Sequence, residues 1–369
     1  MNKEFNLSEY MSEGIENIVK NVLKASMKNP KEAAFVIKYM LSVKDAKNKR
    51  HMLENKGEHI PPLLMGSISS NCNLHCKGCY ARANKSCGDN LKLSEMSEER
   101  WGEIFNEAKK IGISFLLLLG GEPLMRRGVI EKASSVKEIV FPIFTNGTML
   151  DEDYINLFDK NRNLVPMISI EGYKNQTDSR RGEGTYNSIM IAMNSLTKKG
   201  ILFGGSVTVT TENIITVTSK EFAQDLYNKG ARVLIFVEYV PVTKNTRNLA
   251  PTDKERLILA EKVEELRKVF ESMVFLSFPG DEKYSGGCLA AGRGFFHINA
   301  KGGAEPCPFS PYSDVNLKGN SLREALKSQL FKKLKDNEML TGEHDGGCLL
   351  FEKEEDVKKL NINCLHHCR

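Results

Sequence analysis

The amino-acid sequence predicts an α/β fold built on a parallel sheet. Between residues 61 and 275, short apolar and β-branched segments alternate with stretches long enough for helices. Continuously apolar strands of this kind are covered on both faces, and their alternation with helices is the pattern of parallel βα units. Six such strands can be counted, which is fewer than the eight that close a full barrel. Residues 1–60 are predicted to be a helical extension and residues 276–369 a small Cys-rich module.

The composition and the net charge indicate which classes of protein this chain can belong to. Of the 369 residues 41% are hydrophobic and 27% charged, which is typical of a soluble globular protein. A net charge of +5 is small for this length and gives no reason to expect a nucleic-acid partner. No apolar run approaches the roughly 18–20 residues of a membrane span. The first residues, "MNKEFNLSEYMSEG", lack the apolar core of a signal peptide, so we expect a cytoplasmic protein.

The N-terminal extension has helical periodicity. In "MSEGIENIVKNVLKASMKN" apolar residues recur three and four positions apart. The Lys-rich end, "YMLSVKDAKNKRHMLENKGEH", is interpreted as a solvated face or a linker. Pro61 and Pro62 close this segment.

The strands and helices of the central part follow in order. Ser97 is a predicted N-cap for a helix whose apolar stripe includes Trp101, Ile104 and Phe105. Two further helices, in "TYNSIMIAMNSLTKKG" and "SKEFAQDLYNKG", each end on Gly. The six predicted strands lie in "PLLMGSIS", "SFLLLLGG", "IVFPIFTNG", "LVPMISIEG", "ILFGGSVTVTTEN" and "ARVLIFVEYVP".

Three cysteines follow the first strand at close spacing. Cys72, Cys76 and Cys79 lie in "SSNCNLHCKGCYARA", and nine cysteines in a cytoplasmic chain favour metal binding or catalysis over disulfides. A structural zinc ion needs four protein ligands, for which Cys87 or His75 could supply the fourth. Thioredoxin-type chemistry would leave Cys72 unexplained. A 4Fe–4S cluster bound by three thiolates would leave one iron open to a small molecule.

The ends of the next three strands carry groups suited to a zwitterionic amino acid. "GGEP" (120–123) combines glycines that permit close backbone approach with the carboxylate of Glu122. "TNGT" (145–148) is small and polar, and "SIEG" (169–172) is followed by "TDSRRGEGTY" with Arg180 and Arg181. Arginine pairs bidentately with carboxylates. Because the carboxyl ends of parallel strands meet at one edge, these groups are predicted to form one site.

These motifs together resemble those of the radical S-adenosylmethionine (SAM) enzymes. The match is Cys72-x3-Cys76-x2-Cys79 followed by the aromatic Tyr80, with "GGEP" and "SIEG…RRGEGTY" after it, and it covers about residues 62–250. The resemblance implies a partial (β/α)6 TIM-like barrel and a 4Fe–4S cluster whose open iron chelates SAM. It also implies one-electron reductive cleavage of SAM to methionine and a 5′-deoxyadenosyl radical, with an electron donor such as flavodoxin or ferredoxin. Oxygen and water would have to be excluded.

The resemblance assigns roles by motif. Cys72, Cys76 and Cys79 would bind the cluster, and Gly120, Gly121 and Glu122 would hold the amino group of SAM. The other implied SAM-binding residues are Tyr80, Ser169, Arg181 and Thr208. Ser169 and Arg181 would contact the ribose or carboxylate, and Arg181 is preferred to Arg180 because it directly precedes Gly182. Where many relatives have Asp after the fourth strand, this sequence has Glu171.

The C-terminal module resembles the auxiliary-cluster modules called SPASM or twitch. Cys288-x13-Gly302-x4-Cys307 has the form of their first half, but only five cysteines follow residue 276. This implies one auxiliary 4Fe–4S cluster bound by Cys288, Cys307 and Cys348. Cys364 or Cys368 would supply the fourth ligand. Zinc remains an alternative because His366 and His367 lie in the same tail. His297 is interpreted as structural, and Arg293, the acidic "GDE" at 280–282, Glu238 and Tyr239 as residues of the barrel mouth.

Three functions follow from these patterns. The first is a radical SAM oxidoreductase that abstracts hydrogen from a peptide or protein side chain. The second uses the same chemistry in small-molecule or porphyrin-type cofactor biosynthesis. The third is a non-catalytic iron–sulfur or zinc protein. The helical N-terminal extension lacks the strand pattern of a winged-helix peptide-recognition domain, which weakens the peptide interpretation.

Overall fold

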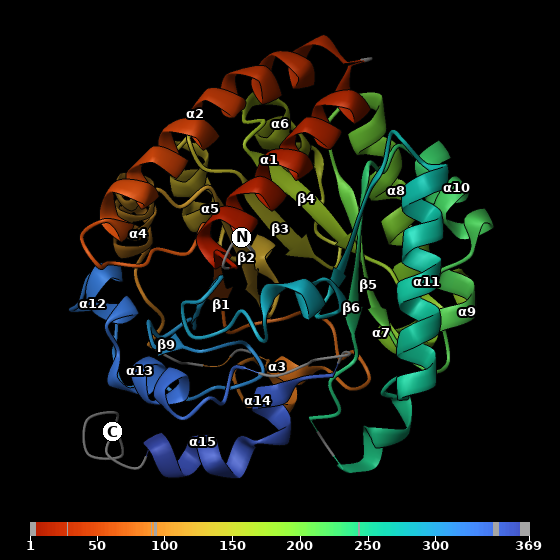
Figure 1. Cartoon of the computed structure of the whole chain (residues 1–369). Coiled ribbons are helices and arrows are strands. Elements are labelled where there is room, and N and C mark those ends of the chain that lie inside the picture. Colours follow the sequence, from red (N-terminus) through yellow and green to blue (C-terminus); the bar gives the residue numbers. More distant parts are fainter. Residues whose placement is uncertain are drawn as a thin grey trace.

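Seven parallel strands form the centre of the protein, and they are arranged as the expected partial barrel (Figure 1). The computed structural model describes residues 5–27, 29–89, 91, 94–242, 244–341 and 347–361. Neighbouring strands pair in the spatial order β7-β6-β5-β4-β3-β2-β1. Their bounds are β1 Leu63–Ser69, β2 Phe115–Gly120, β3 Phe141–Thr145, β4 Leu164–Ser169, β5 Gly204–Val209, β6 Val233–Glu238 and β7 Val274–Phe278.

Six of these strands are the predicted ones, and β7 is an addition to them. The predicted boundary between the barrel and the loop-rich module, after residue 275, falls inside β7, because Val274–Phe278 follows a long helix and ends at Pro279-Gly280. Beyond β7, the short strand β8 (His297–Ile298) pairs in parallel with β1, and β9 (Ala304–Glu305) pairs antiparallel with β8. The Cys-rich module therefore continues the barrel sheet directly.

Helices cover the outer face of the sheet and both ends of the barrel (Figure 1). Ser97 caps α4 as predicted, since its hydroxyl accepts a hydrogen bond from Arg100 N at 3.1 Å. The longer helices are α1 Leu7–Ser26, α2 Pro30–Glu54, α4 Glu98–Ile111, α8 Thr185–Lys198 and α11 Asp253–Val269. The shorter α-helices are α3 Tyr80–Ala83, α5 Arg127–Ser134, α6 Glu152–Lys160, α7 Lys174–Arg181, α9 Ile214–Val217, α10 Lys220–Asn228, α12 Leu322–Leu326, α13 Gln329–Asp336, α14 Leu349–Glu352 and α15 Glu354–Asn361. Three 3-10 helices, η1 Pro123–Met125, η2 Lys244–Leu249 and η3 Gly280–Ser285, complete the set.

The two N-terminal helices cross the amino ends of the barrel strands, opposite the C-terminal helices (Figure 1). Apolar residues of α1 and α2, among them Val19 and Val43, form one core with the first residues of several strands. Buried Arg50 of α2 donates hydrogen bonds to Gly112 O at 2.6 Å and to Ser12 Oγ at 3.0 Å. The Lys-rich end is therefore the outer face of a helix that continues to Glu54, and not a linker.

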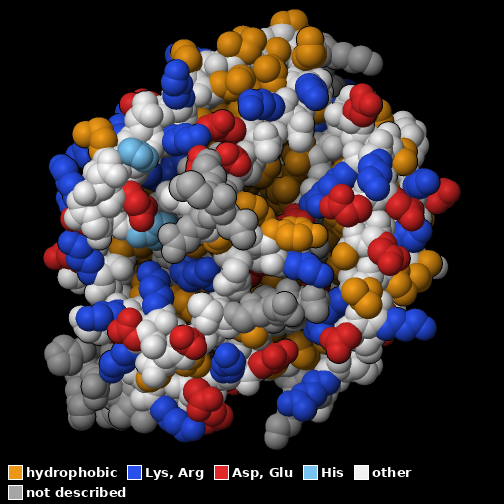
Figure 2. Space-filling view, in the orientation of Figure 1, with side chains coloured by type: hydrophobic (Ala, Val, Ile, Leu, Met, Phe, Trp, Pro, Cys, Tyr) orange, Lys and Arg blue, Asp and Glu red, His pale blue; other side chains and the backbone are white. Residues whose placement is uncertain are grey.

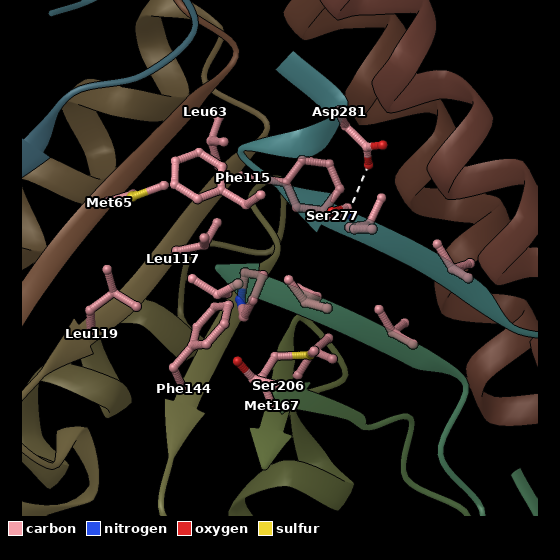
Figure 3. Close-up of a pocket in the computed structure, with 18 of the residues that line it drawn as sticks. Leu63, Met65, Phe115, Leu117, Leu119, Phe144, Met167, Ser206, Ser277 and Asp281 are labelled. Carbon is pink, nitrogen blue, oxygen red and sulfur yellow. Dashed lines mark hydrogen bonds between the residues drawn. The ribbon is translucent and has the colours of Figure 1, made fainter. Parts of the chain in front are cut away.

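The interior of the barrel is an apolar cavity of about 1270 Å³. Side chains from successive strands point into it, including Leu63, Leu117, Phe144 and Met167 (Figure 3). Closed barrels fill this space with layers of side chains. Here Leu117, Leu119 and Phe144 remain partly exposed. Figure 2 shows a hollow with hydrophobic side chains inside it, and residues of α1 are part of the cavity wall.

Candidate active site

The cysteine loop (residues 70–79) lies at the carboxyl end of β1. A register shift between Ser67 and Ser69 precedes the last pair of β1 with β2, that of Ser69 with Gly120, and the chain then continues into the loop. Lys77 N donates to Arg180 O at 2.8 Å, which joins the loop to α7. Arg82 donates to Leu74 O at 2.7 Å and to Cys72 O at 3.2 Å. The loop is thus fixed from two sides, and all three of its cysteines line the barrel cavity.

The three thiols differ in their electrostatic surroundings. Burial raises the pKa of Cys72 to about 11, and it also raises the pKa of Cys76. A hydrogen bond from the Cys87 thiol lowers the pKa of Cys79 to about 6. The guanidinium of Arg181 lies 3.8 Å from Cys76 Sγ and favours its thiolate form. Burial keeps Cys72 and Cys76 in the protonated thiol form, whereas metals bind the thiolate. When a cluster binds, its cationic irons would therefore replace these protons.

The proposed fourth zinc ligands have other partners. His75 is exposed, and its Nε2 lies 2.7 Å from Asp89 Oδ2. Cys87 is buried behind Cys79 and acts as its hydrogen-bond donor. Among the described residues, no group of three or more His, Cys, Asp or Glu side chains converges on one metal ion. A 4Fe–4S cluster distributes its protein ligands over different irons, so thiols around a cluster stand further apart than the ligands of one ion.

The glycine segment after β2 lies directly against the cysteine loop. A Cβ added to Gly121 would overlap the carbonyl oxygen of Asn71, and one added to Gly120 would overlap that of Ser69. Gly120 also has a φ of 137°, which L side chains rarely adopt. Only glycine therefore allows this strand end to approach the cysteine loop so closely.

Glu122 is fully buried and makes more contacts than its predicted role requires. Its carboxylate accepts hydrogen bonds from Leu124 N at 3.1 Å, Thr145 Oγ1 at 2.7 Å and Asn146 N at 2.8 Å. These bonds join the ends of β2 and β3. Burial raises the pKa of Glu122, and these hydrogen bonds oppose that effect. A carboxylate can accept a further hydrogen bond, so its contact with the amino group of SAM stays a prediction.

The end of β4 is organised around buried Glu171. Its carboxylate pairs with both Arg180 and Arg181, and it accepts a hydrogen bond from Thr208 N at 3.0 Å. Glu171 therefore positions Arg181 beside Cys76, which explains why an acidic residue is needed here. The side chains of Ser169, Arg181 and Thr208 line the cavity, together with Tyr80, which packs against Phe309 with ring centroids 5.0 Å apart, and their contacts with SAM stay predictions.

Two residues named for the barrel mouth behave differently from each other. Glu238 accepts hydrogen bonds from Arg256 Nε at 3.0 Å and from Gly347 N at 2.9 Å, so it is part of the supporting structure. Tyr239 packs against Gly78 of the cysteine loop and against the guanidinium of Arg180. Its hydroxyl is buried and has no hydrogen-bond partner. Sequence reasoning placed both at the mouth but had no signal to separate them.

The profile of the Radical SAM superfamily matches residues 67–224, the segment that contains all of these groups up to Thr208. The part of the chain that carries the site belongs to the radical SAM superfamily. It is therefore an enzyme, and a 4Fe–4S cluster and SAM are the cofactors that membership of this superfamily implies. The interpretation as a non-catalytic iron–sulfur or zinc protein is set aside.

Relatives of this radical SAM chain act on different substrates. The AdoMet-dependent heme synthase of Methanosarcina barkeri is 25% identical over 76% of this chain and 87% of its own length. The PqqA peptide cyclase of Rhizobium meliloti is 25% identical over 71% of this chain and 73% of its own length. Streptococcus suis SuiB bound to S-adenosylmethionine superposes with a TM-score of 0.67 at 17% identity, over 86% of this chain and 80% of that one. A further SuiB structure contains the precursor peptide SuiA. At this identity the likeness to SuiB shows a shared fold.

The residues present fit the implied cofactors. The three thiols of the cysteine loop line the cavity, and two buried polar groups near them lack hydrogen-bond partners, namely Nε of Arg181 and the hydroxyl of Tyr239. Buried polar groups are normally hydrogen-bonded, so unpaired donors indicate a ligand with acceptor atoms. The carboxylate and ribose of SAM carry such acceptors.

Among the described residues, no helix combines the length and apolarity needed to cross a membrane.

A second group of cysteines lies where the C-terminal module meets η3. Cys288 and Cys307 are buried and Cys348 is partly exposed. Burial raises the pKa of all three thiols, and Cys348 adds to the raised pKa of both Cys288 and Cys307. Arg293 does not line the barrel cavity, because its guanidinium donates to Cys288 O at 2.6 Å and to Ser285 O at 3.1 Å. Buried His297 lies between Ser67 and Glu305, at 2.8 and 2.7 Å, and is structural. Cys364, Cys368, His366 and His367 lie outside the described residues.

Proposed function

We propose that this chain is a radical SAM oxidoreductase that holds a 4Fe–4S cluster through Cys72, Cys76 and Cys79. When bound, the reduced cluster and SAM supply a 5′-deoxyadenosyl radical, with release of methionine. The observation that carries the proposal is the convergence of three thiols, the glycine strand end and Arg181 at one end of a single cavity. The rest of that cavity is the space in which a substrate would lie.

The protein's own residues have definite tasks in this proposal. Gly120 and Gly121 keep the strand end close enough for the ligand to contact backbone. Arg181, oriented by Glu171, offers its unpaired Nε to the carboxylate or ribose of SAM. The apolar walls of the barrel exclude water from the reacting atoms, as the chemistry of a reactive radical requires.

The first candidate substrate is a peptide or protein side chain. Ser169, Ser206 and Thr208 line the cavity from β4 and β5, and the labelled side chains of β1 to β4 in Figure 3 are apolar, whereas Ser277 and Asp281 lie on the β7 side. A peptide backbone buried in an apolar wall would lack hydrogen-bond partners. A peptide would therefore insert an apolar side chain while its main chain remains at the mouth.

A small molecule with a large apolar body is the second candidate, and the depth of the cavity favours it. Ligand pockets are typically about 300–1,000 Å³, and this cavity of about 1270 Å³ extends from the cysteine loop to α1. The similarity to a heme synthase agrees with a porphyrin-type substrate. A soluble iron porphyrin, monitored by its absorbance, should bind saturably to the wild-type protein. This binding should be lost in Leu117→Trp. The absence of saturable binding to the wild-type protein would argue against this candidate.

The proposed function is tested by SAM cleavage. The protein is reconstituted anaerobically with iron and sulfide, reduced with dithionite and mixed with SAM, and 5′-deoxyadenosine and methionine are quantified. We expect the two products in equal amounts. A protein with a 4Fe–4S absorbance band that forms neither product would refute the proposal. In the cell, an external electron donor such as flavodoxin or ferredoxin would take the place of dithionite. An auxiliary 4Fe–4S cluster on Cys288, Cys307 and Cys348 is a separate part of the proposal.

A further inference from the structure

One exposed side of α2 is apolar over about three turns of the helix. Four exposed residues follow one another there at spacings of three or four positions, namely Pro30, Ala34, Ile37 and Leu41. Residues at these spacings lie along one side of a helix. Ile37 is 57% exposed and Leu41 is 71% exposed. Single exposed hydrophobic residues are common in proteins, whereas a row of them on one side of a helix indicates a surface that binds a partner. We call this row the α2 stripe.

The same part of the chain is rich in exposed lysines. They lie on α1 and α2, at Lys20, Lys24, Lys31, Lys38 and Lys44. The only acidic residue between positions 17 and 44 is Glu32, and its carboxylate is buried and paired with Arg162. Lys31 pairs with Asp159 at 3.3 Å. Figure 2 shows hydrophobic side chains at the top of the molecule, where α2 lies, with lysines or arginines beside them. This surface is therefore both apolar and positively charged.

Three kinds of partner fit this surface poorly. A second copy of the chain, paired through the α2 stripe, would bring its own lysines against these lysines. A nucleic acid would pair with the lysines, but it would place a charged backbone against the apolar stripe. An electron donor would have to approach the cysteine loop at the carboxyl end of β1, whereas α1 and α2 cross the amino ends of the strands (Figure 1).

An anionic lipid surface matches both properties of this face. Helices that bind at a membrane surface place apolar side chains among the lipids, and their lysines pair with the headgroups. Basic residues beside a membrane are attracted by the negative surface potential of anionic lipids. A helix lying flat on such a surface needs no pocket, and the α2 stripe is a straight row on the outside of the molecule.

The pair of helices that carries this face also forms part of the wall of the barrel cavity. Residues of α1 such as Ile18 and Val22 line the cavity. Glu16 of α1 pairs with Lys47 of α2 at 2.9 Å, which joins the two helices. A substrate with a large apolar body would therefore have only a short path from a membrane to the cavity. This link to the substrate rests on the second candidate of the proposed function.

We propose that the α2 stripe and the lysines beside it dock the protein on the surface of a membrane that contains anionic lipids. The helix α2 lies along that surface, with Ile37 and Leu41 among the lipids and the lysines at the headgroups. Docking of this kind does not depend on SAM cleavage, so the two can be measured separately. The partner is the lipid surface itself and not a protein within it.

The first test removes the apolar side chains. The reconstituted full-length chain is sedimented with vesicles of phosphatidylcholine and phosphatidylglycerol in equal parts, and with vesicles of phosphatidylcholine alone. We expect binding to the anionic vesicles that weakens as salt is added. Ile37→Gln with Leu41→Gln should lower the partition coefficient by about tenfold or more. Ile191→Gln with Leu257→Gln is the matched control, because these side chains are 67% and 58% exposed on α8 and α11, and it should leave binding unchanged.

The second test removes the charges. Lys20→Gln with Lys38→Gln should lower the partition coefficient for anionic vesicles by about 30-fold. Lys220→Gln with Lys254→Gln is the matched control, because both lysines are exposed but lie on α10 and α11. Formation of 5′-deoxyadenosine without vesicles should be the same in all four variants. Circular dichroism checks that each variant is folded, which we expect because every substituted side chain is exposed.

Four results would overturn the inference. The first is a wild-type protein that does not bind the anionic vesicles, whether or not it cleaves SAM. The second is an equal loss of binding in the stripe variant and its control. The third is a loss in the lysine variant alone, which would mean that α2 does not enter the lipid surface. The fourth is a wild-type protein that is a dimer by sedimentation and becomes monomeric in the stripe variant, since a second copy would then cover this face. Retention by a nucleic acid duplex but not by vesicles would likewise contradict docking on lipid.

Discussion

Arg181 and Arg180 are adjacent, yet their positions predict unequal importance for SAM. Both pair with Glu171, but Arg181 lies beside Cys76 and Arg180 packs over Tyr239. Sequence motifs pointed to Arg181 through its place before Gly182. They gave no sign that Glu171 holds both guanidiniums, because ion pairing between segments depends on how the loops fold.

We expect Arg181→Met to weaken SAM binding by about 10- to 100-fold. A hydrogen bond to a charged group contributes about 1.5–3 kcal/mol, and about 1.4 kcal/mol corresponds to tenfold in affinity. Arg180→Met is the matched control, with a smaller expected loss. Equilibrium dialysis of SAM against anaerobically reconstituted protein, with iron content measured in parallel, gives the comparison. A larger loss in Arg180→Met would reverse the assignment.

At the scale of elements, α2 is attached to the barrel by charged side chains that are almost completely buried. Glu32 pairs with Arg162, which also pairs with Asp159, and Glu32 accepts a hydrogen bond from Leu202 N at 2.9 Å. The sequence predicted helix over residues 1–60 from apolar periodicity. It did not predict the packing of that helix on the strand ends, because a Glu and an Arg 130 positions apart give no pairwise signal.

We expect Glu32→Gln to lower the free energy of unfolding by about 3 kcal/mol. Removing one partner of a buried ion pair typically costs about 3–5 kcal/mol, and the remaining contact of Arg162 with Asp159 reduces this cost. Lys31→Gln is the control, because Lys31 is 68% exposed in its pair with Asp159 and should change stability by less than about 1 kcal/mol. Urea unfolding followed by circular dichroism measures both. Equal effects of the two substitutions would show that the buried pair does not anchor α2.

At the scale of the whole molecule, one cavity connects the cysteine loop, the barrel interior and α1. The sequence was informative where chemistry is local, as in the cysteine spacing, the glycine strand end and the strand–helix alternation. It missed β7, and it placed Glu282 near the barrel mouth without any sign that one of its carboxylate oxygens has no hydrogen-bond partner. Whether a buried group has a hydrogen-bond partner depends on segments that are distant in the sequence.

The central claim is that the fourth coordination position of the first cluster is left for SAM and not filled by Cys87. The Cys87 thiol lowers the pKa of Cys79, so the two cysteines are neighbours and replacing each with alanine changes the same small region. The decisive measurement is 5′-deoxyadenosine formed by Cys79→Ala and by Cys87→Ala after identical anaerobic reconstitution. We expect none from Cys79→Ala and a wild-type amount from Cys87→Ala. Loss of the product in Cys87→Ala, or its formation by Cys79→Ala, would contradict the account.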